Sequence, residues 1–183
     1  MKKIFKYIFL NILGWKINDK FPDIEKSVII FAPHTSYWDG FYGKLYFKIA
    51  GINHKFLSKS EFFKFPIKYF FKAFGSIPVY KNKESVDQIA ELYNNNKELH
   101  IILSPEGHLT KTTHWKKGFY YISTKANVPI IVGYIDYKKK EVGIKGVIRN
   151  TNCVKQTMIY INDMYKNVNA KYPENFALDK RFS

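Results

Sequence analysis

A histidine and an aspartate lie close together in the segment Phe-Ala-Pro-His-Thr-Ser-Tyr-Trp-Asp-Gly at residues 31–40. His34 follows an apolar run that ends at a proline, and Asp39 comes five positions later, at the start of a predicted helix. A carboxylate that accepts a hydrogen bond from one imidazole nitrogen leaves the other nitrogen free to act as a base. The spacing therefore fits general-base catalysis on a substrate hydroxyl. It also fits a structural helix cap, in which Asp39 serves only the helix N-terminus.

A second polar segment follows another apolar run. Residues 104–118 read Ser-Pro-Glu-Gly-His-Leu-Thr-Lys-Thr-Thr-His-Trp-Lys-Lys-Gly. Glu106 and Gly107 form a predicted turn, and Lys111, Lys116 and Lys117 follow it. Cations, hydroxyls and a glycine turn suit a phosphate-bearing ligand. A solvated basic loop would have the same composition, so both interpretations stay open.

Metal and disulfide chemistry are not expected. His100, His108 and His114 do not have the spacing of a helical histidine pair, and no thiolate lies near them. Cys153 is the single cysteine of the chain, which excludes an internal disulfide framework.

The segments around these residues alternate short apolar runs with longer mixed stretches, which predict strands and helices respectively. The predicted strands lie at residues 27–32, 55–58, 76–80, 99–103, 129–136 and 141–144, the last two as a hairpin. The predicted helices lie at residues 38–49, 61–74 with a break at Pro66, 83–94, 115–125 and 151–167. This order predicts an α/β fold with a central, mostly parallel sheet flanked by helices, in which sites gather beyond the carboxyl ends of strands.

Length and composition set further bounds. At 183 residues, a single domain over residues 1–183 is expected, and 46% hydrophobic residues exclude a disordered chain. The net charge of +15 favours an anionic partner such as a membrane surface, nucleic acid or an acidic protein. Only Arg149 and Arg181 are arginines. This scarcity disfavours sequence-specific DNA recognition, while nonspecific nucleic-acid binding stays an alternative function.

The amino-terminal residues 1–15 predict an amphipathic helix with a broad apolar face behind three lysines. That face consists of Ile4, Phe5, Ile8, Phe9, Ile12 and Leu13. Such a helix either lies in a membrane interface or docks on the core. No window reaches the roughly 20 apolar residues that span a bilayer.

Two other segments have an unusual composition. Residues 59–75 interleave aromatic residues with lysines, which is typical of a membrane-facing helix pair, and several of these phenylalanines are alternatively core or acyl-groove residues. Residues 170–183 have no clear periodicity and predict a loosely packed tail.

Four ordered blocks together resemble the glycerolipid acyltransferase superfamily, which contains the lysophosphatidic acid acyltransferases. The His-four residues-Asp block is His34 to Asp39, and residues 75–81, Gly-Ser-Ile-Pro-Val-Tyr-Lys, are similar to the Gly-x-Ile-x-x-x-Arg block. Residues 105–109, Pro-Glu-Gly-His-Leu, resemble Pro-Glu-Gly-Thr-Arg, and residues 128–132 match the Val-Pro-Ile block. The resemblance covers residues 25–145 and is closest to short members without transmembrane helices.

This resemblance implies direct acyl transfer with no cofactor. His34 would be the general base and Asp39 its orienting partner, while Lys81, Glu106, Gly107 and Lys111 would bind substrate. The donor would be acyl-CoA or acyl-carrier protein and the acceptor a lysophospholipid-like hydroxyl. The enzyme would act in the cytoplasm, peripherally on the inner face of the cell membrane.

Two departures from the family pattern concern the acceptor. Leu109 replaces the arginine that the family uses for the acceptor's phosphate, and Lys81 replaces an arginine while keeping its charge but not its planar fork. Lys111 would compensate for the first loss. Another hydroxyl lipid is then a possible acceptor, and a non-catalytic lipid-binding relative is a second alternative function.

Overall fold

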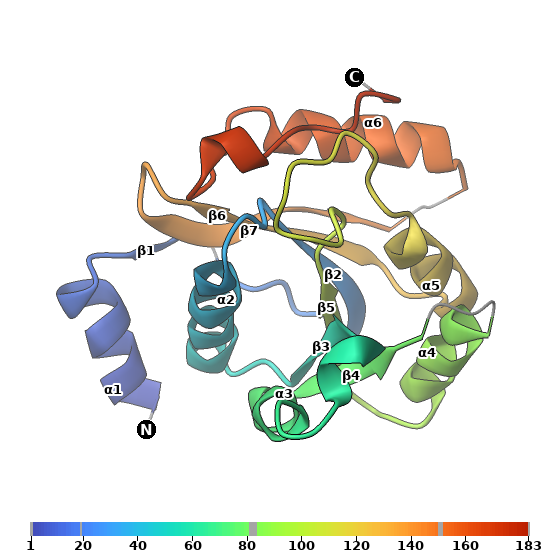
Figure 1. Ribbon diagram of the computed structural model, residues 1–183, viewed down its shortest axis with the longest axis horizontal. Helices are drawn as coiled ribbons and strands as arrows, with labels where there is room; N and C mark the ends of the chain where they lie inside the picture. Colours follow the sequence, from blue (N-terminus) through green and yellow to red (C-terminus); the bar gives the residue numbers. More distant parts are fainter. Residues whose placement is uncertain (1, 19, 81–83, 150–151, 183) are drawn as a thin grey trace.

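The computed structural model describes residues 2–18, 20–80, 84–149 and 152–182, and a seven-stranded sheet forms its centre (Figure 1). The strands are β1 (Lys16–Asn18), β2 (Lys26–Ala32), β3 (His54–Lys59), β4 (Ser76–Val79), β5 (Leu99–Leu103), β6 (Ile130–Asp136) and β7 (Glu141–Ile148). Their order across the sheet is β1-β7-β6-β2-β5-β3-β4. All neighbours run parallel except β6 and β7, which form the predicted hairpin. The α/β prediction is confirmed.

Helices cover both faces of this sheet. They are α1 (Lys2–Tyr7), the π-helical turn η1 (Ile8–Ile12), α2 (Tyr37–Ala50), η2 (Ser60–Phe63), α3 (Lys68–Phe74), α4 (Ser85–Asn94), α5 (Gly118–Ala126), α6 (Val154–Tyr165) and η3 (Pro173–Asn175). Helices α4, α5 and α6 enclose the larger core cluster, and η1 and α2 enclose the smaller one on the other face. Helix α3 lies beside α2, because the ring of Phe74 approaches Gly40.

Strand β2 shows why this sequence makes a central strand. Val28, Ile30 and Ala32 belong to the larger cluster, whereas Ile29 and Phe31 belong to the smaller one. Side chains alternate between the faces of a strand with a period of two, so a strand covered on both sides has to be apolar at every position. The continuous apolar run of this strand therefore matches its burial by helices on both faces of the sheet.

Several element boundaries differ from the predictions. Strand β1 was not predicted, because its three residues are too few to show a period. The predicted break at Pro66 is present, but the part before it is the short 3-10 helix η2 and α3 begins only at Lys68. Helix α5 begins at Gly118, because the N–H of Trp115 donates to a carboxylate in the carboxyl-terminal segment. Strand β7 extends to Ile148, and α6 ends at Tyr165.

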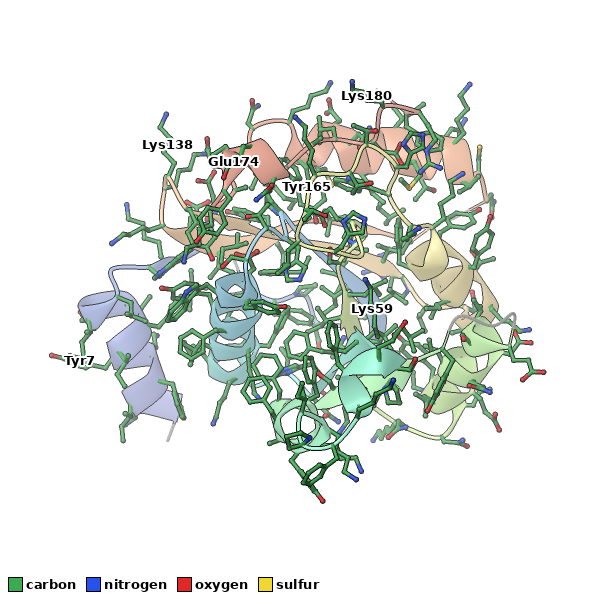
Figure 2. All side chains as sticks on the ribbon, in the orientation of Figure 1. Tyr7, Lys59, Lys138, Tyr165, Glu174 and Lys180 are labelled. Atoms are coloured by element: carbon green, nitrogen blue, oxygen red, sulfur yellow. The ribbon has the colours of Figure 1, made fainter. Side chains whose placement is uncertain are left out.

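The amino-terminal segment uses its apolar residues in two ways. Phe9 is fully buried against the smaller cluster, and the ammonium of Lys48 on α2 lies over the ring of Phe5. Ile4 and Ile12 are exposed, and so is Tyr7, which points away from the body of the molecule (Figure 2). The helix thus docks through one side and leaves other apolar residues in water. Among the described residues, none of the helices combines the length and hydropathy needed to cross a membrane.

The prediction of a loosely packed tail at residues 170–183 is wrong for the described part of that segment. Ala170 and Asp179 are buried, and Phe176, Leu178 and Phe182 pack on the larger cluster. The Asp179 carboxylate accepts hydrogen bonds from the backbone N–H of Trp115 and from the Arg181 side chain. Polar residues that bind each other inside the fold leave no apolar period, so the sequence pattern does not show this packing.

Burial alone would raise the pKa of Asp179, but hydrogen bonds from Arg181 and Trp115 outweigh it and lower that pKa. Replacing Asp179 by Asn removes the charge that these donors bind, so Asp179→Asn should lower the free energy of unfolding by about 2–3 kcal/mol. Urea unfolding followed by circular dichroism measures this. Glu174→Gln, at an exposed carboxylate in the same segment, is the matched control. Equal stability of the two variants would contradict the role given to Asp179.

His100 is a buried polar side chain where β5 meets β2. Its Nδ1 lies 2.8 Å from the Ser27 hydroxyl, and its ring packs edge-on against Phe21. Burial, only partly opposed by Glu98 and reinforced by His54, lowers the pKa of His100 to about 4. The fold therefore holds this imidazole neutral at pH values where it would be protonated in the unfolded chain.

A lowered histidine pKa makes stability depend on pH. Between about pH 6.5 and pH 4 the unfolded chain binds a proton that the folded chain does not, so stability falls as the pH falls through this range. From pH 7.5 to pH 5, the wild type should lose about 1–2 kcal/mol more than His100→Asn, which keeps a polar atom toward Ser27. Urea titrations at both pH values test this. His114→Asn, at an exposed histidine, should lose as much as the wild type.

Candidate active site

Four of the predicted site residues, His34, Asp39, Glu106 and Gly107, lie just beyond the ends of β2 and β5, next to the end of β6. These strands are neighbours and parallel, so their carboxyl ends share one edge of the sheet. The turn after β2 carries His34 and leads into α2, the loop after β5 carries Glu106, and Tyr137 directly follows β6. The topology alone therefore brings three distant parts of the sequence to one place.

Asp39 and His34 face each other at the start of α2. The His34 Nδ1 lies 3.4 Å from the Asp39 Oδ2, and the His34 side chain is 30% exposed while that of Asp39 is 1% exposed. The same Oδ2 accepts hydrogen bonds from the N–H groups of Thr35 at 2.7 Å and Ser36 at 2.8 Å. Ser36 and Asp39 form a capping box. The capping and orienting interpretations of Asp39 are therefore compatible, because one oxygen serves both.

The other oxygen of Asp39 has a partner that the sequence did not reveal. The Tyr137 hydroxyl donates a hydrogen bond of 2.6 Å to the Asp39 Oδ1. Burial and the neighbouring Asp39 carboxylate both raise the pKa of Tyr137, so this hydroxyl stays protonated and remains a donor. Two backbone N–H groups on one oxygen and a phenol on the other thus hold the Asp39 carboxylate facing the imidazole.

Glu106 holds the main chain of His34. Its Oε1 accepts a hydrogen bond of 2.8 Å from the His34 N–H, and its Oε2 accepts one of 2.6 Å from the Ser104 hydroxyl. The side chain is almost fully buried, and burial raises the pKa of Glu106 despite these hydrogen bonds and the nearby imidazole. Direct substrate contact by Glu106 stays a prediction, while its contact with the histidine backbone is a feature of the structure.

The remaining predicted residues lie on the loop or outside the described chain. Gly107 has a φ of +75°, in the left-handed region that favours glycine, and a side chain there would press on Lys116. Lys111 is exposed on the same loop and has no ion-pair partner among the described residues. Lys81 lies outside the described residues. Leu109, where the family pattern has arginine, is half-buried.

Residues 169–172 form a carboxyl-terminal segment, here called the strap, that contacts the end of β6 and the turn after β2. The Tyr172 N–H donates to the Thr35 hydroxyl, and the Lys171 ammonium lies 5.0 Å from the centre of the Trp38 ring. Asn169 fastens the strap through hydrogen bonds to the Asp136 carboxylate at the end of β6. The strap therefore supports the turn that carries His34, a role that sequence periodicity could not indicate.

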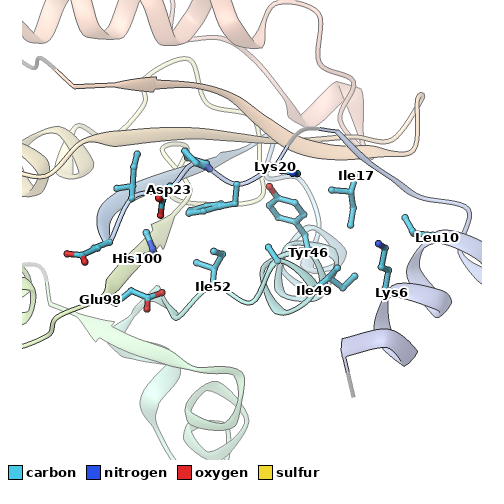
Figure 3. A pocket seen from close by; sticks show the side chains of 15 residues that line it. Lys6, Leu10, Ile17, Lys20, Asp23, Tyr46, Ile49, Ile52, Glu98 and His100 are labelled. Atoms are coloured by element: carbon cyan, nitrogen blue, oxygen red, sulfur yellow. The ribbon is translucent and has the colours of Figure 1, made fainter.

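A cavity lies away from these residues. It measures about 890 Å³ and is bounded by η1, the carboxyl-terminal half of α2 and the segment before β2, at the amino ends of β2 and β5 (Figure 3). Its wall includes Lys6, Tyr46, Glu98 and His100. Because His34 is at the opposite ends of these strands, this cavity does not define the site. Nowhere in the described ranges do three His, Cys, Asp or Glu side chains gather to hold a metal ion.

The mostly parallel sheet carries a histidine–carboxylate pair after β2, an arrangement that the acyltransferase resemblance implies. In the solved structures, the 1-acyl-sn-glycerophosphate acyltransferase PlsC of Thermotoga maritima is similar, with a TM-score of 0.63 and 17% identity over 90% of this chain and 75% of that chain. No curated protein matches the sequence. The Acyltransferase family model matches residues 15–135, more than half of the chain. The chain therefore belongs to this family, within the glycerolipid acyltransferase superfamily.

Removing the Tyr137 hydroxyl tests whether it positions the Asp39–His34 pair. Tyr137→Phe keeps the ring packing and leaves the Asp39 Oδ1 without its donor. We expect kcat for acyl transfer to fall about tenfold with KM nearly unchanged, because the hydroxyl holds the orienting group and not the substrate. Steady-state kinetics provide both values, and Tyr160→Phe at an exposed tyrosine of α6 is the control. A change confined to KM, or none at all, would show that Tyr137 does not act through Asp39.

Proposed function

We propose that this protein is an O-acyltransferase of membrane lipid biosynthesis. It transfers a fatty acyl group from acyl-CoA or acyl-carrier protein to the hydroxyl of a lysophospholipid-like acceptor. The observation that carries the proposal is the His34–Asp39 pair, in which a buried, fully hydrogen-bonded carboxylate faces one nitrogen of a partly exposed imidazole. Membership of the Acyltransferase family supports it.

The reaction follows from which imidazole nitrogen is free. With Nδ1 toward Asp39, Nε2 is available to take the proton of the acceptor hydroxyl as its oxygen bonds to the thioester carbonyl carbon. Collapse of the tetrahedral intermediate breaks the carbon–sulfur bond and forms the ester, and the thiolate leaving group receives the proton from His34. The Asp39 charge stabilises the imidazolium between these steps. No acyl-enzyme forms, because His34 acts on the acceptor and not on the donor.

The residues of the loop after β5 indicate which kind of acceptor headgroup the site could bind. Leu109 cannot bind a phosphate, and the lysines 111, 116 and 117 of the same loop supply the cations that an anionic headgroup requires. An acceptor held by lysines alone is bound less rigidly than one held by an arginine fork. We place the reaction at the inner face of the cell membrane, with the protein bound peripherally, since such acceptors reside in membranes.

Replacing the base gives the decisive test of this proposal. His34→Ala should lower acyl transfer by about 10²–10⁴-fold, the usual contribution of a positioned general base. Purified protein is incubated with membranes and labelled acyl-CoA or acyl-carrier protein, and acylated lipids are identified by mass spectrometry. Asp39→Asn should lower turnover similarly and, because Asp39 also caps α2, should lower the free energy of unfolding by about 1 kcal/mol.

The outcomes of this assay separate the proposal from its alternatives. A product that disappears in folded His34→Ala supports the enzyme and identifies the acceptor. Unchanged turnover in that variant contradicts the role of His34. Absence of product with either donor, from a protein that still binds lipid, would favour the non-catalytic relative, for which the replacement of the family's arginine by Leu109 is the specific observation.

A further inference from the structure

Residues 60–74 form an unpartnered aromatic surface. Neither η2 nor α3 contains a buried residue, although most of their side chains are aromatic or aliphatic. Phe65 is 76% exposed, Phe70 66% and Tyr69 61%, and Ile67 and Phe62 are also exposed. Scattered exposed apolar residues are normal, but a contiguous group of this kind marks an interaction surface.

Internal ring contacts keep this surface in shape. The rings of Phe62 and Phe71 stack at 5.0 Å with an interplanar angle of 1°, and Phe74 connects the group to the core through Phe56 at 5.1 Å. The Lys44 ammonium of α2 donates to the Ala73 carbonyl and lies over the Phe74 ring. Phe71 and Phe74 therefore support the more exposed rings from beneath.

The charged residues of this segment are mostly lysines. Lys59, Lys64, Lys68 and Lys72 alternate with the aromatic residues, and Glu61 is the only acid in residues 59–75. Aromatic rings favour the depth of lipid headgroups, and lysine stems follow apolar surface while their ammonium groups reach phosphates. Each such lysine contributes about 1 kcal/mol near an anionic leaflet.

The surface continues toward the active site along α2. Tyr37, Phe41, Lys44 and Lys48 recur at helical spacing on one face of α2, and Tyr37 and Phe41 are exposed. Lys44 contacts α3 and Lys48 contacts Phe5 of α1, so this face lies between the two helices. This face begins at Tyr37, three positions after His34 in the sequence.

We infer that residues 60–74, together with the outer face of α2, form a docking surface for an anionic lipid bilayer. The occupant is a membrane surface because the exposed rings are close together, the surrounding charges are lysines and no acid opposes them beyond Glu61. Docking on this face places the turn that carries His34 next to the headgroups. The inference concerns binding alone, so it does not depend on the acyl-transfer chemistry.

Flotation with lipid vesicles tests this surface. The probe is phosphatidylcholine vesicles with and without phosphatidylglycerol, and the wild type should float with the anionic vesicles. Phe65→Ser/Tyr69→Ser should weaken this binding by about tenfold or more. These two exposed rings contact each other, and the substitutions remove both from the interface. Ile159→Ser/Tyr160→Ser on α6, on the opposite side of the molecule from α3 (Figure 1), is the matched control and should bind like the wild type.

A charge variant separates the electrostatic part. Lys64→Glu/Lys72→Glu should lose the preference for phosphatidylglycerol. Lys155→Glu/Lys166→Glu, on α6 and at its C-cap, has the same net charge and should keep most of that preference. Near-ultraviolet circular dichroism verifies that each variant is folded. His34→Ala should float like the wild type, so lost catalysis with intact flotation would contradict only the proposed function.

Two results would overturn the inference. One is flotation of Phe65→Ser/Tyr69→Ser that equals the wild type, which would show that another part of the protein contacts lipid. The other is a wild type that ignores both vesicle types but binds acyl-carrier protein through these residues, which would make the surface a protein-docking site.

Discussion

The buried carboxylate of Asp39 is the interaction on which the candidate site depends. Removing a carboxylate from water is costly unless its oxygens find donors, and here the N–H groups of Thr35 and Ser36 and the hydroxyl of Tyr137 supply them. These donors come from the two residues before α2 and from the residue after β6. Burial of this charge therefore depends on the pairing of β2 with β6, which brings Tyr137 to Asp39.

Glu106 complements Asp39 at the same histidine. Asp39 faces the imidazole of His34, whereas Glu106 binds its backbone N–H, so one carboxylate orients the side chain and the other fixes the main chain. Their environments differ, because Glu106 has fewer donors and burial raises its pKa. The hydrogen bonds from the His34 N–H and the Ser104 hydroxyl only partly oppose this effect of burial on Glu106.

The sequence predicted what depends on local spacing and missed what depends on long-range contact. The apolar run of β2 and the His34–Asp39 spacing lie within a few residues, so periodicity and capping rules indicated them. Tyr137 lies 98 positions from Asp39, and Glu106 lies 72 positions from His34. Parallel topology would have placed both at one edge of the sheet, but not in contact. The packed tail was missed because polar bonds around Asp179 leave no apolar pattern.

The carboxyl-terminal segment holds the end of the basic loop after β5 in position. Asp179 binds the N–H of Trp115, and the Trp115 ring N–H donates to the Ala177 carbonyl, so the end of the loop after β5 is fixed by the tail. Tyr172 of the same segment binds Thr35 beside His34. This one segment thus contacts both the turn that carries His34 and the end of the loop that carries Lys111. Lys111, before Trp115 on this loop, is exposed.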